Sequence, residues 1–108
     1  MNEQFFLPVF QAVESTGLTK LKTGFYKLAI RYAVTRAEWN FLSVEEKMES
    51  NDARTRLHNA LIDSLNILAR NMNKAGEPVE WRRILGDDRK VIGDFACYVS
   101  AWLGIRQR

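Results

Sequence analysis

The chain has 108 residues, of which 46% are apolar and 27% are charged. This composition is typical of a globular protein and not of a disordered chain. The length fits one domain, which can form its core without disulfides or metal. No stretch reaches the roughly 18 uncharged apolar residues of a membrane helix, and the first residues lack the positive start of a secretory signal. The net charge of +3 does not by itself imply a nucleic-acid partner. From these features together we expect a single domain over residues 1–108, located in the cytoplasm and without membrane contact.

The N-terminal part of the chain predicts two helices. The first covers about residues 7–15, because Pro8 suits a first turn and Gly17 suits a helix end. An earlier start would place Pro8 inside the helix and kink it. The second helix covers about residues 19–40. Its apolar side chains occupy more than one side, which is typical of a helix that lies centrally in a bundle or contacts a partner.

A capping signal follows, in which the hydroxyl of Ser43 precedes the carboxylate of Glu46 by three residues. The acidic segment behind it either breaks around residues 50–52 or runs straight into the next helix, and we favour the break. That next helix covers about residues 52–74, with apolar residues at steps of three and four. A polar stripe lies opposite, which we interpret as a solvated face; it consists of Arg56, Asn59, Asp63, Asn66 and Arg70.

The C-terminal part predicts a short helix and a long one. The short helix covers about residues 79–85 and ends at Gly86. Asp87 and Asp88 then suit the start of a last helix that runs to about residue 105. Gly93 inside it costs about 1 kcal/mol relative to alanine, so we expect another helix to approach closely there. Because no segment predicts a strand, the expected fold is an all-α compact bundle of four to five helices.

Few residues offer catalytic or metal-binding chemistry. The single cysteine, Cys97, and the single histidine, His58, form no cluster for zinc, an iron–sulfur centre or a Cys–His nucleophile. His58 projects near the edge of an apolar stripe, where it acts either as a general base or as a boundary residue with one ring nitrogen bonded inside the fold. We favour the boundary residue.

A pair of carboxylates gives a partial match to an enzyme motif. Glu46 and Glu49 resemble the ExxE element with which the all-α nucleotide pyrophosphohydrolases hold Mg²⁺, but no downstream pair matches the second element of that motif. We therefore predict that the chain is not an enzyme, and that it has no catalytic residues, no cofactor, no bound metal and no small-molecule substrate.

Residues 18–37 carry five basic residues and no acidic one. We favour a solvated role for these charges, or neutralisation by the acidic residues of 38–52. The alternative is nucleic-acid binding, since phosphate contacts need lysine and arginine on one surface and Tyr26 offers a ring for base stacking. The nucleic-acid candidates are Lys20, Lys22, Lys27, Arg31 and Arg36. Six further cations would widen this surface if the fold brings them together: Arg54, Arg56, Arg82, Arg83, Arg89 and Lys90.

Residues 80–100 also have the outline of a helix-turn-helix. Their second helix is strongly apolar, however, whereas a recognition helix offers polar side chains to base edges. The apolar and aromatic content instead favours a partner surface that includes Tyr26, Ile30 and Trp39. The leading hypothesis is therefore a non-enzymatic interaction or regulatory module that contacts another protein or a second copy of itself. The alternative is a nucleic-acid-binding protein that uses the basic helix at about residues 19–36.

Two stretches of the C-terminal half resemble small uncharacterised helical proteins of Gram-positive bacteria and their phages. One is RLHNALID at residues 56–63, and the other is WRRILGDDR at residues 81–89, which continues to IGDFA at residues 92–96. The resemblance implies a bacterial or phage origin. It carries no functional signature, and therefore implies no activity and no site residues.

Overall fold

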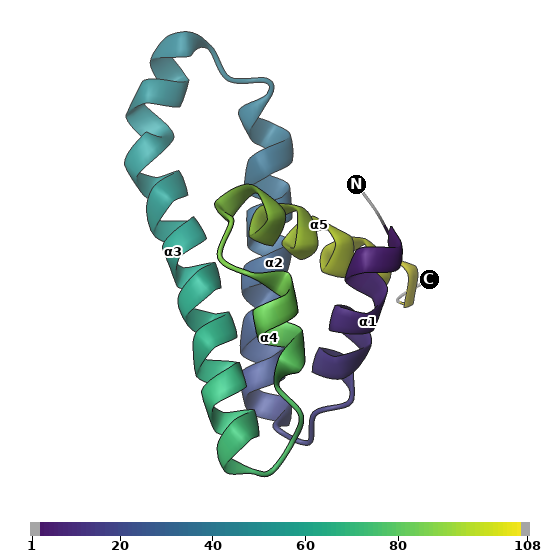
Figure 1. Cartoon of the computed structure of the whole chain (residues 1–108). Coiled ribbons are helices and arrows are strands. Elements are labelled where there is room, and N and C mark those ends of the chain that lie inside the picture. Colours follow the sequence, from purple (N-terminus) through teal and green to yellow (C-terminus); the bar gives the residue numbers. More distant parts are fainter. Residues whose placement is uncertain (1–2, 107–108) are drawn as a thin grey trace.

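The computed structural model describes residues 3–106, which form five α-helices without any strand and so confirm the predicted all-α bundle (Figure 1). The long helices α2 and α3 lie side by side as an antiparallel hairpin, and α5 crosses α2. No helix within the described range is long and apolar enough to cross a membrane. The elements are α1 (Glu3–Glu14), α2 (Thr19–Trp39), α3 (Val44–Lys74), α4 (Glu80–Leu85) and α5 (Arg89–Arg106).

Helix α1 begins earlier than the sequence predicts, at Glu3 instead of about residue 7, and Pro8 lies inside it. The first turn is held by packing, because Phe6 is buried against the rings of Phe95 and Tyr98. Pro8 itself is exposed and removes only one backbone hydrogen bond from the helix. Burial of an aromatic ring outweighs that loss.

The predicted break at residues 50–52 is wrong, because α3 is continuous over 31 residues. Its start is fixed by the predicted capping box: Ser43 Oγ accepts from the Glu46 N–H at 3.1 Å, and Glu46 Oε1 accepts from the Ser43 N–H at 2.8 Å. Ser, Asn and Asp cost only tenths of a kcal/mol each inside a helix, and the segment holds no glycine or proline that would end one. The acidic segment is therefore the first part of α3.

The core lies where α1, α4 and α5 pack around the lower half of the hairpin. Phe25 of α2 and Phe95 of α5 are fully buried and stack at 6.1 Å between ring centroids. The predicted close approach at Gly93 is confirmed: a Cβ atom placed there would lie 2.5 Å from the hydroxyl of Tyr32. The glycine thus permits α5 to cross directly over α2.

The polar stripe on α3 is exposed, as predicted, yet it also ties the helices together. Asn59 Oδ1 accepts from Arg89 at 3.0 Å, and Asn66 Oδ1 accepts from Arg82 Nε at 2.8 Å. Arg82 further donates to the carbonyl of Gly86 at 2.7 Å. The carboxylate of Asp88 caps α5 by accepting the backbone N–H of Lys90 at 2.9 Å. These bonds position the start of α5 against the middle of α3.

Candidate functional site

The end of the α2–α3 hairpin, residues 33–57, extends from the contact with α5, where Arg36 pairs with Asp94, to a loop that projects beyond the other helices (Figure 1). We call this segment the hairpin tip. None of its apolar side chains is buried; the buried apolar residues nearest to it in the sequence are Tyr32 and Leu61. The hairpin tip is therefore folded without a core of its own.

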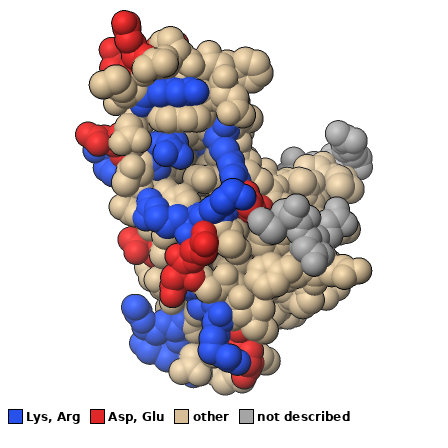
Figure 2. Space-filling model, turned by 45° about the horizontal axis from the view of Figure 1, so that its top comes forward, with Lys and Arg blue, Asp and Glu red and all other residues tan. Residues whose placement is uncertain are grey.

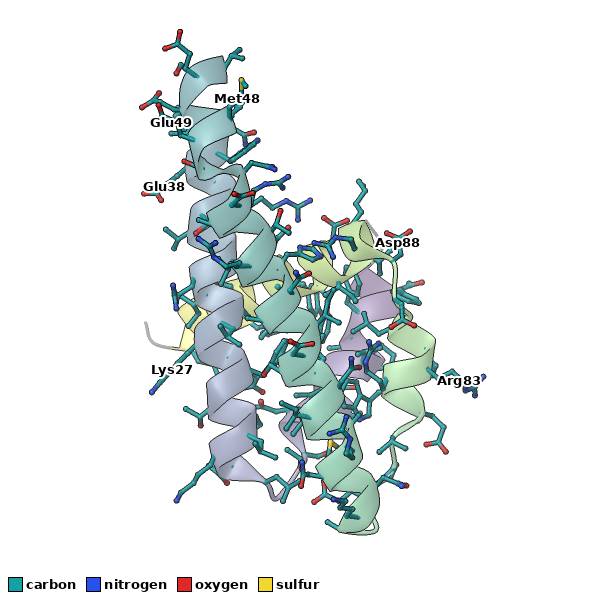
Figure 3. All side chains as sticks on the ribbon, turned by 90° about the vertical axis from the view of Figure 1, so that its left-hand side faces the viewer. Lys27, Glu38, Met48, Glu49, Arg83 and Asp88 are labelled. Atoms are coloured by element: carbon teal, nitrogen blue, oxygen red, sulfur yellow. The ribbon has the colours of Figure 1, made fainter. Side chains whose placement is uncertain are left out.

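Instead, the hairpin tip exposes large apolar side chains. Phe41 is 89% exposed, Val44 75% and Met48 74%, and Val34 on α2 is 52% exposed. Figure 3 shows Met48 near the far end of the hairpin. Single exposed apolar residues are ordinary, but several on one projecting segment form an unusually apolar surface.

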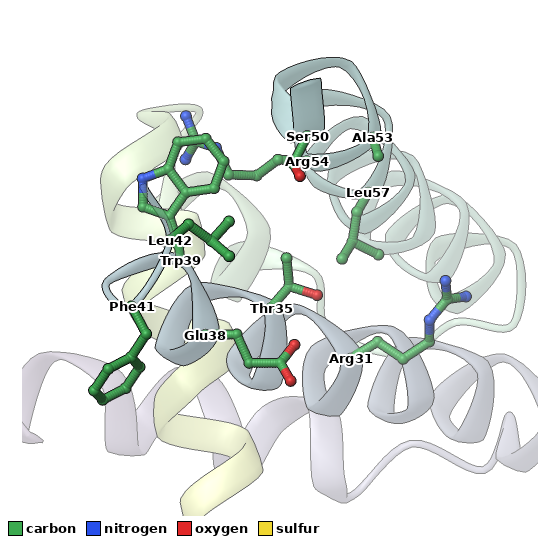
Figure 4. A pocket seen from close by; sticks show the side chains of 10 residues that line it. All are labelled: Arg31, Thr35, Glu38, Trp39, Phe41, Leu42, Ser50, Ala53, Arg54 and Leu57. Carbon is green, nitrogen blue, oxygen red and sulfur yellow. The ribbon is translucent and has the colours of Figure 1, made fainter. Parts of the chain in front are cut away.

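A groove of about 550 Å³ runs between α2 and α3 at the hairpin tip (Figure 4). The Trp39 ring lies over the guanidinium of Arg54 at 4.5 Å and near the ammonium of Lys47 at 5.9 Å. Leu42 and Leu57 add apolar surface to the groove, while Phe41 points away from it. The Trp39 ring therefore contacts two cations, whereas Phe41 is the most exposed large apolar side chain of the hairpin tip.

The hairpin tip also carries the acidic residues. Glu38 and Glu49 project outward (Figure 3), and Glu45 and Asp52 are exposed as well. Glu46 serves the capping box, and the Ser43 N–H and hydroxyl hold the pKa of its carboxyl below its usual range. Within residues 3–106, no group of three or more His, Cys, Asp or Glu side chains lies together as a metal site would need.

The structure divides the five basic residues predicted to bind nucleic acid. Lys20, Lys27 and Arg31 are exposed along one side of α2, and Figure 3 shows Lys27 pointing outward. Lys22 donates to the carbonyl of Glu14 at 2.8 Å, and Arg36 pairs with Asp94 at 2.7 Å. At 100° per residue, Lys22 and Arg36 fall on the opposite side of α2, toward α1 and α5.

The three predicted partner residues are also separated. Tyr26 is half-buried, contacts the rings of Phe10 and Phe25, and donates its hydroxyl to the carboxylate of Glu14. Burial and the Glu14 carboxylate raise the pKa of Tyr26. Ile30 is 39% exposed on α2, whereas Trp39 belongs to the hairpin tip. Ile30 is therefore the most exposed of the three, while Tyr26 and Trp39 are both half-buried.

A second site lies at the base of the hairpin tip, where α2, α3 and α5 meet. Four cations and His58 surround a cavity of about 280 Å³, which we call the basic pocket. Figure 2 shows Lys and Arg side chains gathering in the middle of one face. The sequence had suggested that distant cations could converge, and three of the six named for that role do so. The lining is Tyr32, Arg36, Arg54, Thr55, His58, Arg89 and Lys90.

His58 is the buried polar residue of the basic pocket, only 7% exposed, with its ring edge-on to Tyr32. Burial lowers the pKa of His58, and the charges of Arg89, Arg54 and Arg36 lower it further, against a backbone hydrogen bond with Arg89. His58 is thus buried at the edge of the apolar stripe, as the prediction of a boundary residue expected, and its Nε2 has no hydrogen-bond partner. The cations around His58 come from three different helices and are brought together only by the tertiary structure.

Comparisons of this chain with models of protein families, with curated proteins and with solved structures find no match. The two surfaces are therefore interpreted from their own chemistry.

Proposed function

We propose that this chain is a non-enzymatic helical module that binds another protein surface through the hairpin tip, and that a second copy of the chain is the first partner to test. The observation that carries the proposal is a projecting hairpin tip that buries none of its apolar side chains and exposes Phe41, Val44 and Met48. A segment that exposes apolar side chains and has no buried core of its own gains stability when a partner covers those side chains.

The size of the gain sets the conditions of the test. Full burial of a side chain of this kind contributes about 1.5–3 kcal/mol, against which association costs about 4–15 kcal/mol of lost freedom. Three such side chains from each of two copies are enough for weak to moderate association. Self-association should therefore be sought at high protein concentration.

Sedimentation equilibrium from about 10 to about 500 μM would test self-association. We expect the wild-type mass to rise toward that of a dimer, and Phe41→Ser with Met48→Ser to remain monomeric. The matched control is Ile84→Ser with Ile105→Ser, which changes side chains that are 52% and 58% exposed but lie outside the hairpin tip. The control should associate as the wild type does.

If all three proteins are monomeric, the partner must be a different protein. Cross-linked complexes recovered with the wild type should then be lost with the Phe41→Ser, Met48→Ser variant and kept with the control. Equal recovery with both variants would contradict binding through the hairpin tip.

A second candidate function, nucleic-acid binding, is favoured by the exposed Lys20, Lys27 and Arg31 on one side of α2, in a stretch that holds no acidic residue. Three phosphate contacts predict that duplex DNA binds about 40-fold more weakly at 200 mM than at 50 mM salt. Lys27→Glu with Arg31→Glu should abolish binding in a fluorescence anisotropy titration, whereas Lys74→Glu with Arg83→Glu should not. Unchanged affinity in the first variant would exclude this function.

A further inference from the structure

We propose that the basic pocket binds a phosphate group, either free inorganic phosphate or the terminal group of a small phosphomonoester. The first reason is charge. Arg36, Arg54, Arg89 and Lys90 come together from three helices. Within residues 3–106, the carboxylate that pairs with them is Asp94, 2.7 Å from Arg36 and 3.7 Å from Lys90. Three positive charges remain in excess around one cavity, an arrangement that favours an anion.

The second reason is a pair of buried nitrogens without hydrogen-bond partners. Among the described residues, neither Nε2 of His58 nor Nε of Arg54 has a hydrogen-bond partner, although both atoms are buried. Leaving a buried donor or acceptor unpaired costs about 1–3 kcal/mol. An anion in the pocket would supply an oxygen acceptor to Nε of Arg54, and to Nε2 of His58 once the ring is protonated.

The third reason is the start of α5, an 18-residue helix whose first two residues are Arg89 and Lys90. The N-terminus of a helix carries partial positive charge and normally attracts acidic side chains. Here Asp88 provides the cap through its bonds to the backbone N–H groups of Lys90 and Val91, and no acidic residue follows in the first turn. Because Asp88 already occupies the helix end, a bound anion would compensate Arg89 and Lys90.

The size of the pocket limits the ligand. A volume of about 280 Å³ lies just below the roughly 300–1,000 Å³ of pockets that hold drug-sized molecules. Arginine pairs with phosphate oxygens through two parallel N–H groups, and a phosphate offers more oxygens to three arginines than a carboxylate does.

Protonation of His58 is part of this recognition. Because Nε2 has no partner, the backbone hydrogen bond with Arg89 belongs to the other ring nitrogen. Nε2 then becomes a donor to the anion when the ring is protonated. The groups that face the ring are Tyr32 and Arg36 of α2, Arg54 of α3, and Arg89 and Lys90 of α5, with Asp94 behind Arg36. A phosphate would offset the cations that now oppose protonation.

The single histidine makes the test direct, since its ring proton signal in an NMR spectrum belongs to His58 alone. We would titrate inorganic phosphate at constant ionic strength, balanced with sodium chloride, across the pH range of the histidine. We expect a saturable change and a rise of about one unit in the pKa of His58, equivalent to about tenfold tighter binding to the protonated ring.

Arg89→Gln and, separately, the exposed Lys90→Gln should each weaken phosphate binding at least several-fold, while Arg83→Gln should leave it unchanged. Circular dichroism verifies that each variant is folded. Identical titrations with and without phosphate, or unchanged affinity in both pocket variants, would overturn the proposal.

Adenosine monophosphate and methyl phosphate distinguish the two sources of the group. Tighter binding of a monoester than of inorganic phosphate assigns a phosphorylated small molecule, and weaker binding assigns the free ion. The Phe41→Ser, Met48→Ser variant should bind phosphate like the wild type, so failure at the hairpin tip is distinguishable from failure here.

Discussion

His58 shows how one buried side chain makes stability depend on pH. Its pKa is lowered in the folded protein, so the unfolded chain takes up the proton first as the pH falls. We expect the free energy of unfolding to decrease as the pH drops through about 6.5, the ordinary value for histidine, and to level off below the folded pKa. Urea unfolding between about pH 8 and pH 5 would measure this.

The control for that prediction is His58→Phe, which keeps a ring beside Tyr32 and removes the titrating group. The variant should lose the slope of stability against pH between about 7 and 5, whatever its absolute stability. Parallel curves for the two proteins would show that another group causes the effect.

For single residues, the sequence predicted the local structure where one residue determines it. A lone histidine at the edge of an apolar stripe predicted a boundary residue, and Gly93 predicted a close helix approach. The pairing of His58 with Arg54, Arg89 and Lys90 could not be predicted, because it depends on where α5 crosses the hairpin. Periodicity identifies the face of each helix and says nothing about which faces meet.

Among the elements, the crossing of α5 over α2 makes the sharpest prediction. Gly93→Ala would place a Cβ atom against the hydroxyl and ring of Tyr32, which is itself held against His58. Overpacking of this kind costs about 1–3 kcal/mol and outweighs the gain of up to about 1 kcal/mol in helix propensity. We expect a net destabilisation of about 1–2 kcal/mol by thermal or urea unfolding.

Gly24→Ala provides the matched case in α2, since a Cβ atom there meets nothing within 4 Å. It should stabilise the protein by about 0.5–1 kcal/mol through propensity alone. A stabilising Gly93→Ala would mean that Tyr32 moves aside readily.

Several helix boundaries followed local chemistry, although α1 ends at Glu14, before the predicted position relative to Gly17. Ser43 with Glu46, Gly86, and Asp88 each lie at an element end as predicted. The two larger errors, the start of α1 and the break in α3, arose where no such residue decides. Phe6 extends α1 because its partners on α5 bury it, and this contact cannot be read from neighbouring residues.

The whole molecule has a packed body and an unpacked hairpin tip, and the two should differ in local stability. Backbone amides at residues 46–57 of α3 are expected to exchange with solvent faster than those at 61–72, because the first segment buries no apolar side chain. Hydrogen exchange at low protein concentration measures these rates. The Phe41→Ser variant is the control, and it should not slow the exchange of residues 46–57. Uniform protection along α3 would contradict a coreless hairpin tip.

The length of α3 also governs how the protein tumbles. Its 31 residues correspond to about 46 Å, nearly the whole longest dimension of 47 Å, while the other extents are 29 and 24 Å. Rotation is therefore slower end over end than about the long axis. The N–H vectors of α2 and α3 lie along that axis and those of α5 lie across it (Figure 1), so ¹⁵N relaxation should separate the helices into two groups. An end-to-end dimer through the hairpin tip would increase the difference in ¹⁵N relaxation between the two groups of helices, whereas a side-by-side dimer would decrease it.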